Sequence, residues 1–200
     1  STEECRDNLL RTLDVSTAQA TLKAIMECVN PVLSPAQYRL VGTSAALLQS
    51  VQLPARGVDF VMKERSTVDA FHLAMSPFEC TVQPIHLPEA KQYWASYKVN
   101  GTEVAVSTVE WETNSDAIEC FGSGPWQHFT MIPCGIYNVP TVKLELRLIS
   151  ELCRNRPECY RPLIRALQRR ADLGLVKRGL EERQIDPTMQ ADVLRQLAAD

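Results

Sequence analysis

The first third of the chain combines helix-like and strand-like spacing of apolar residues. Between Ser16 and Val29 apolar residues recur every three or four positions, which predicts a helix. Two short runs, Tyr38–Val41 and Val58–Met62, contain β-branched and aromatic residues and predict buried strands. Gly42 closes the first run, and Thr43-Ser44 can cap a short helix before the second. The predicted order is helix, strand, glycine turn, helix, strand.

The middle of the chain contains a hairpin signal. Asn100-Gly101 is the preferred dipeptide of a type I′ turn, and it lies between the runs Tyr93–Val99 and Thr102–Val109. Because the loop has two residues, Val99 faces Thr102 across the hairpin. Alternation along the strands then separates apolar from charged residues: Ala95, Tyr97, Val104 and Val106 lie on one face, and Lys98 and Glu103 on the other.

Helical spacing dominates the C-terminal part of the chain. Residues Thr113 to Pro140 are rich in glycine and proline and are predicted to form a long loop. A capping-box spacing earlier in the chain predicts one more helix, from Ser66 to Met75. The regions with helical spacing beyond the loop are Val142–Cys153, Glu158–Arg170, Leu173–Arg183 and Pro187–Ala199. We therefore expect an α/β (α+β) core over residues 1–140, and a helical region over residues 141–200 that packs on it.

The composition is typical of a globular protein. The chain has 200 residues, of which 45% are hydrophobic and 22% charged, with a net charge of −3. No run approaches the ~20 apolar residues of a membrane span, and the acidic start Ser1-Thr2-Glu3-Glu4 is unlike a signal peptide. Seven scattered cysteines without a CxxC pair fit reduced thiols better than disulfides or a zinc site. We expect a cytoplasmic protein.

Two neighbouring segments carry the candidate chemistry. The first is Leu40–Leu48, with Gly42-Thr43-Ser44 at its turn, and the second is Gly57-Val58-Asp59-Phe60-Val61. Together they resemble the minimal nucleotidyltransferase superfamily, whose signature is a strand, a glycine turn that enters a helix, and a strand with Asp-x-Asp. The resemblance covers Tyr38 to Val109. It implies a mixed sheet flanked by helices, with helices following the core as the C-terminal region does here.

The residue types of this signature suit the binding of a nucleoside triphosphate. Backbone N–H groups of a glycine turn that opens a helix bind phosphate oxygens, and a nearby carboxylate holds Mg²⁺ against the same phosphates. Gly42, Thr43 and Ser44 are the candidate phosphate cradle, and Asp59 is the candidate metal ligand and catalytic residue. Arg56, just before the acidic strand, is a candidate contact of the triphosphate, although a surface ion pair explains it equally well.

The acidic set departs from the family pattern. If Gly57-Val58-Asp59 takes the place of Asp-x-Asp, the first acid is a glycine, and if Asp59 is the first acid, Val61 stands in the second place. A third carboxylate is expected from the hairpin, where Glu103 and Glu110 compete. Glu103 has the alternative role of cross-strand partner of Lys98. Glu110 is slightly favoured as the second metal-binding and catalytic carboxylate, because it is in phase with the apolar face of the hairpin.

A basic stripe is predicted in the C-terminal region. Arg161, Arg165 and Arg169 are spaced four residues apart, so that one helix face could receive a polyphosphate or an RNA backbone. A solvated helix face is the commoner interpretation of such a stripe. Nucleic acid is therefore a possible but not a favoured partner.

Two functions remain open at this stage. The first is Mg²⁺-dependent transfer of a nucleotidyl group from a nucleoside triphosphate to an unknown hydroxyl acceptor, as the resemblance implies. The second is an inactive member of the same fold that binds a nucleotide or another protein, which the incomplete acidic pair favours. A carboxylate that folds back on the site from Glu64 or Asp69 would favour the first.

Overall fold

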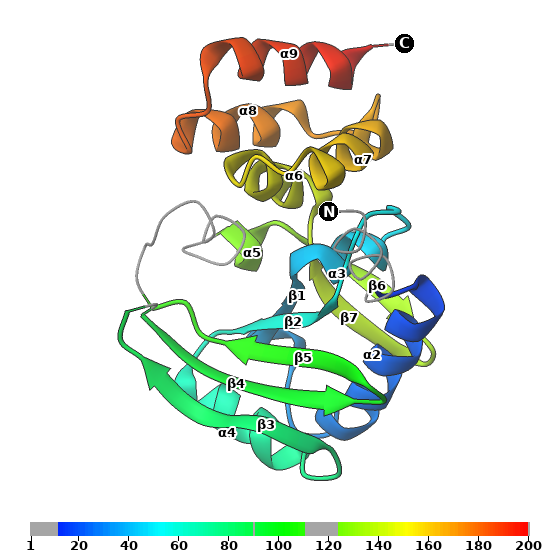
Figure 1. Cartoon of the computed structure of the whole chain (residues 1–200), viewed down its shortest axis with the longest axis vertical. Coiled ribbons are helices and arrows are strands. Elements are labelled where there is room, and N and C mark those ends of the chain that lie inside the picture. Colours follow the sequence, from blue (N-terminus) through cyan, green and yellow to red (C-terminus); the bar gives the residue numbers. More distant parts are fainter. Residues whose placement is uncertain (1–11, 90, 111–123, 200) are drawn as a thin grey trace, which may run out of the picture.

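A mixed seven-stranded sheet forms the centre of the molecule (Figure 1). The computed structural model describes residues 12–89, 91–110 and 124–199. The strand order is β3-β4-β5-β2-β1-β7-β6. The strands are β1 Tyr38–Val41, β2 Gly57–Met62, β3 Glu79–Leu87, β4 Gln92–Val99, β5 Thr102–Ser107, β6 Phe129–Cys134 and β7 Tyr137–Val142. Parallel pairs join β1 to β7 and β2 to β5, and the other pairs are antiparallel. The mixed α/β fold is thus confirmed.

Two helices cover one face of the sheet, which we call the helix-covered face. They are α2 (Val15–Val29) and α4 (Arg65–Ala74), and α4 lies behind β3 and β4 in the view of Figure 1. The residues of this face alternate along each strand with those of the opposite face, which we call the open face. On β2, Val58, Phe60 and Met62 belong to the helix-covered face and are almost completely buried.

Aromatic side chains hold α4 against the sheet. Tyr38 and Phe60 lie with ring centroids 6.0 Å apart, and Phe71 of α4 is 5.8 Å from both Phe60 and Tyr97. All four rings are at most 2% exposed. Tilted and edge-on ring pairs of this kind stabilise a core beyond the area that they bury.

The predicted hairpin is confirmed. Val99 pairs with Thr102, and both turn residues have positive φ, +50° at Asn100 and +79° at Gly101, as a type I′ turn requires. The apolar set of the hairpin lies on the helix-covered face and is buried, whereas Lys98 and Glu103 are exposed on the open face.

Three strands were not predicted. The loop expected over Thr113–Pro140 is wrong for its second half, which forms the hairpin of β6 and β7, while residues 111–123 lie outside the described part. Proline and glycine in this stretch indicated a loop, but Pro133 lies on the edge strand β6, where a missing N–H costs little. The edge strand β3 is interrupted by two shifts in register and contains Pro84, which weakened its alternation.

Four helices follow the sheet, as predicted. They are α6 Leu144–Cys153, α7 Pro157–Leu167, α8 Leu173–Glu182 and α9 Pro187–Ala198. Figure 1 shows them stacked in layers above α3 (Gly42–Leu47), with α6 nearest to it. The division into a core of residues 1–140 and a helical region of residues 141–200 stays a prediction. Within the described residues no helix is long and apolar enough to cross a membrane.

A buried ion pair lies inside α6. Arg147 is 1% exposed, Glu151 is completely buried, and the Arg147 guanidinium donates a hydrogen bond to the Glu151 carboxylate one turn away. The second oxygen of Glu151 lies 3.4 Å from Nε of Arg156, which is partly exposed. Folding removes both charges from water, and the attraction between them offsets part of the desolvation cost of each.

Replacing one member of this pair should destabilise the protein strongly. We expect Glu151→Ala to lower the free energy of unfolding by ~3–5 kcal/mol, because Arg147 would remain buried without its carboxylate. The double variant Arg147→Met/Glu151→Leu should lose less than ~1 kcal/mol, since it removes both charges. Urea unfolding measures both values, and a double variant as unstable as Glu151→Ala would contradict the explanation.

Candidate functional site

The carboxylate of Asp59 lies against the turn at Gly42. Asp59 pairs with Val41, the last residue of β1, so that its side chain is next to the point where the chain enters α3. Gly42 has φ +75°, and a Cβ built on it would lie 2.8 Å from Oδ2 of Asp59. Glycine at position 42 therefore suits the left-handed backbone conformation and leaves the Asp59 carboxylate its present space.

Only part of the predicted phosphate cradle is accessible. Thr43 is half-buried, whereas Ser44 is completely buried and its hydroxyl has no hydrogen-bond partner among the described residues. The expected Thr/Ser cap is also absent, since the helix begins at Gly42 and its N-cap, Val41, makes no side-chain hydrogen bond. If the turn binds phosphate, the backbone and the Thr43 hydroxyl must do so.

The two positions at which the family pattern could lack an acid, Gly57 and Val61, both lie on β2. Val61 is buried and pairs with Arg39 and Ser107. Gly57 has no room for a side chain. It pairs with Glu103 in the parallel ladder of β2 and β5, and a Cβ built on it would lie 2.7 Å from the Glu103 carbonyl oxygen. Backbone cannot move aside as a flexible side chain can. The absence of a carboxylate at position 57 is thus linked to the close approach of two strands.

The structure places Glu103 on the same face as Asp59. Paired residues point to the same side of a sheet, and the register pairs Gly57 with Glu103 and Asp59 with Ala105. Glu103 is therefore the diagonal neighbour of Asp59, one strand across and two residues along, which gives roughly 8 Å between the two positions from ordinary sheet dimensions. It is exposed and lies beside Lys98 of β4.

Glu110 lies on the other face. Its position continues the alternation of Val104, Val106 and Thr108, as expected, but this face is covered by α4, and Asp59 points away from it. The structure therefore does not bring Glu110 together with Asp59. Of the two competing carboxylates, Glu103 is the one near the candidate site.

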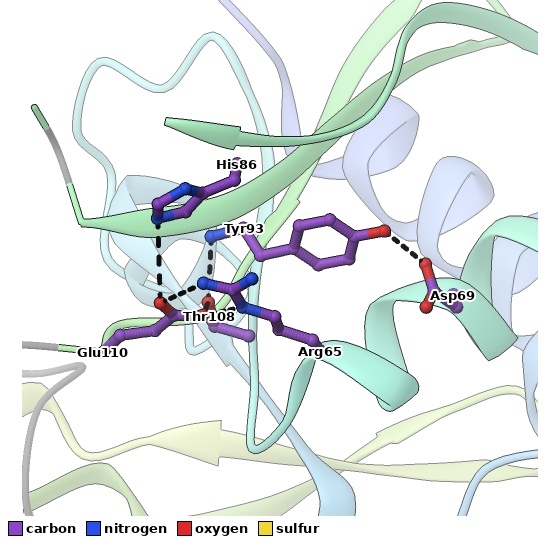
Figure 2. A network of polar contacts seen from close by, with 6 residues as sticks. All are labelled: Arg65, Asp69, His86, Tyr93, Thr108 and Glu110. Carbon is purple, nitrogen blue, oxygen red and sulfur yellow. Dashed lines mark hydrogen bonds and ion pairs between the residues drawn. The ribbon is translucent and has the colours of Figure 1, made fainter. Parts of the chain in front are cut away.

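Glu110 belongs to a separate polar network, drawn in Figure 2. Its two oxygens accept hydrogen bonds from Nε and Nη2 of Arg65, at 2.5 and 2.8 Å, and Oε1 also accepts one from Thr108 at 3.2 Å. The imidazole of His86 lies 4.0 Å away. The hydrogen bonds from Arg65 hold the pKa of Glu110 below its usual value. The Glu110 carboxylate thereby binds Arg65, the first residue of α4.

The other proposed carboxylates also remain away from Asp59. Asp69, on α4, accepts a hydrogen bond of 2.6 Å from the Tyr93 hydroxyl, on the helix-covered face (Figure 2). Glu64 accepts one from the Ser66 hydroxyl at 3.4 Å. Arg56 is exposed and directly precedes β2, so it remains close in the chain to Asp59.

The predicted arginine stripe is shorter than expected. Arg161 and Arg165 are exposed on α7, but that helix ends at Leu167. Arg169 has φ +62° beyond the helix, and its backbone N–H donates to the Leu197 carbonyl at 2.9 Å. Only two members of the stripe therefore share a helix face.

The sequence interpretation missed a buried arginine that contacts two aromatic rings on the open face. Arg39 of β1 is 4% exposed, and its guanidinium lies 4.9 Å from the centre of the Trp126 ring and 3.9 Å from that of Phe129. It donates hydrogen bonds to backbone carbonyls, among them that of Pro125 at 2.9 Å. Burial lowers the pKa of Arg39. A single arginine within an apolar strand gave no signal of this role.

The available carboxylates suit Mg²⁺ only together with a phosphate ligand. No group of three or more His, Cys, Asp or Glu side chains able to hold a metal occurs in the described ranges. Asp59 and Glu103 supply hard oxygen donors on one face, and Mg²⁺ commonly binds through one or two carboxylates, water and substrate phosphates. The donor set therefore fits an ion that arrives with a nucleotide and does not form a closed protein cage.

Comparison with known proteins supports the fold. No protein-family model matches this sequence, and no curated protein does at a significant level. The solved structures similar to this chain include TM1012 from Thermotoga maritima, provisionally described as a nucleotidyltransferase, with a TM-score of 0.50 and 13% identity over 73% of this chain and 91% of that one. JHP933 from Helicobacter pylori has a TM-score of 0.46 and 14% identity, and the match covers 88% of this chain and 77% of that one. The chain therefore shares the fold of a protein assigned provisionally to the nucleotidyltransferases.

Proposed function

We propose that the open face binds a nucleoside triphosphate with Mg²⁺ and transfers its nucleotidyl group to a hydroxyl acceptor. The observation that carries this proposal is the Asp59 carboxylate packed against the Gly42 turn on a sheet face that neither α2 nor α4 covers. The fold shared with TM1012 is consistent with it.

Each residue has a distinct part in the proposal. The backbone at Gly42 and Thr43 would hold phosphate oxygens, and Asp59 and Glu103 are the residues that would hold the metal ion. Bound in this way, Mg²⁺ would neutralise charge on the phosphates. Arg56 approaches the leaving pyrophosphate from the segment before β2. The acceptor oxygen bonds to the α-phosphorus as the bond to pyrophosphate breaks, and the hydroxyl proton passes to water.

A nucleotide-binding protein without transferase activity is the second candidate. It is favoured by Gly57, where the Glu103 carbonyl excludes the carboxylate of the family pattern. Incubation with ATP labelled on the α-phosphate, in the presence of cell RNA and protein, separates the two candidates. Label on a macromolecule together with released pyrophosphate indicates transfer, whereas ATP binding without either indicates a binding protein.

Asp59→Asn should weaken Mg²⁺-dependent ATP binding. We expect a loss of at least ~10-fold in affinity by isothermal titration, because a contact to a charged group is worth ~1.5–3 kcal/mol. Glu110→Gln is the matched control, since this carboxylate lies on the other face, and its affinity should equal that of the wild type. Equal losses in both variants, or no loss in Asp59→Asn, would count against the site.

Gly42→Ala should affect binding more than Gly101→Ala. Both glycines have φ near +75°, so each alanine costs ~1–2 kcal/mol of stability from backbone strain. Only at position 42 does the new Cβ displace the Asp59 carboxylate, because nothing lies within 4 Å of a Cβ at position 101. We expect lower ATP affinity for Gly42→Ala alone, measured beside the unfolding midpoint of each variant. The reverse order would contradict the role of the turn.

Gly57→Asp would create an Asp-x-Asp sequence on β2, but it should not improve Mg²⁺-dependent ATP binding. Its Cβ would clash with the Glu103 carbonyl, so we expect a loss of ~1–3 kcal/mol in unfolding free energy and no gain in Mg²⁺-dependent ATP affinity. Gly57→Ala, with the same Cβ and no carboxylate, should be destabilised to a similar degree. Tighter ATP binding by Gly57→Asp would show that β2 and β5 can separate enough to admit a carboxylate at position 57.

A further inference from the structure

A tryptophan lies on the open face in the row of residues next to Asp59. The register of β4 and β5 pairs Ser96 with Ala105 and Trp94 with Ser107, while Asp59 pairs with Ala105 on the other side of β5. Paired residues share a face, so Trp94 points to the same side as Asp59. Its own neighbour Ala95 is completely buried on the helix-covered face, which confirms this orientation.

The two sites are separated by a distance that one nucleotide can bridge. Trp94 lies two strand spacings across from the Asp59 strand and two residues along it, which gives ~12 Å from ordinary sheet dimensions. The side chains between them are small, since Ser96, Ala105 and Ser107 occupy the intervening positions. Nothing bulky on these strands therefore lies between the indole and the carboxylate.

The two tryptophans of the described part of the chain differ in what their rings contact. Trp126, the other tryptophan in the described part of the chain, has its ring occupied by Arg39 at 4.9 Å and Lys63 at 5.5 Å. Trp94 is half-buried, and its side chain makes no hydrogen bond, ring stacking or cation–π contact with any residue in the described ranges. A large aromatic side chain on a sheet face can stack on a planar partner.

We propose that Trp94 stacks on the base of the nucleotide whose phosphates bind at Gly42 and Asp59. The proposal rests on the proposed function and adds the residue that binds the base. Stacking uses the ring face that every base has, so Trp94 should distinguish a nucleotide from a bare polyphosphate but not one base strongly from another.

Titration of four proteins with two probes tests the proposal. The proteins are the wild type, Trp94→Ala, Trp94→Phe and Ile85→Ala, and the probes are ATP and inorganic tripolyphosphate, both with Mg²⁺. Ile85 pairs with Trp94 on β3 and is 50% exposed, so its truncation controls for loss of nearby apolar surface. We expect Trp94→Ala to weaken ATP binding by at least ~10-fold and to leave tripolyphosphate binding unchanged. Trp94→Phe and Ile85→Ala should each lose less than ~3-fold, since phenylalanine still offers a ring face.

The outcomes separate this inference from the proposed function. Wild-type affinity for ATP in Trp94→Ala, or an equal loss for ATP and tripolyphosphate, would overturn the role of Trp94 and leave the phosphate site standing. Failure of the wild type to bind either probe would overturn both. As a second readout, ATP should quench the tryptophan fluorescence of the wild type, and this quenching should disappear in Trp94→Phe.

Discussion

Alternation of side chains along the strands decides which polar residues of this protein can meet. Asp59 and Glu103 point to the open face, whereas Glu110, Asp69 and His86 belong to the side on which α4 packs. The aromatic contacts of Phe71 hold α4 on that side. A one-residue slip of β5 would exchange the two carboxylates and expose the apolar core, so the packing of the core also fixes the composition of the candidate site.

Two glycines show how close packing shapes the acidic set. At Gly42 the absent side chain leaves space for the Asp59 carboxylate, and at Gly57 it allows the Glu103 backbone to approach β2. Both glycines have a steric reason, and both lie where β1, β2 and β5 are neighbours in the sheet. Strand packing therefore explains why position 57 carries no carboxylate.

Much of the fold could be predicted from local signals, but the composition of the site could not. The turn at Asn100-Gly101 and the strand at Val58–Met62 have strong local patterns, and both are observed. The hairpin of β6 and β7 was missed because Pro133 and Gly135 indicate a loop unless the strand is known to lie at an edge. Whether Glu103 or Glu110 lies near Asp59 depends on which face of the sheet the helices cover. This cannot be predicted from a short stretch of sequence. Trp94 needed the pairing of three strands before its position relative to Asp59 could be seen.

The ion pair buried in α6 restricts how this protein can change over time. Arg147 and Glu151 lie on consecutive turns in the layer between α3 and the outer helices, where neither charge can reach water. A lineage that replaces either residue first must pass through an intermediate in which the remaining buried charge has lost its ion-pair partner within α6. A substitution at one position is therefore tolerated only when the other position changes with it. The two positions should vary together even where the rest of the helical layer diverges.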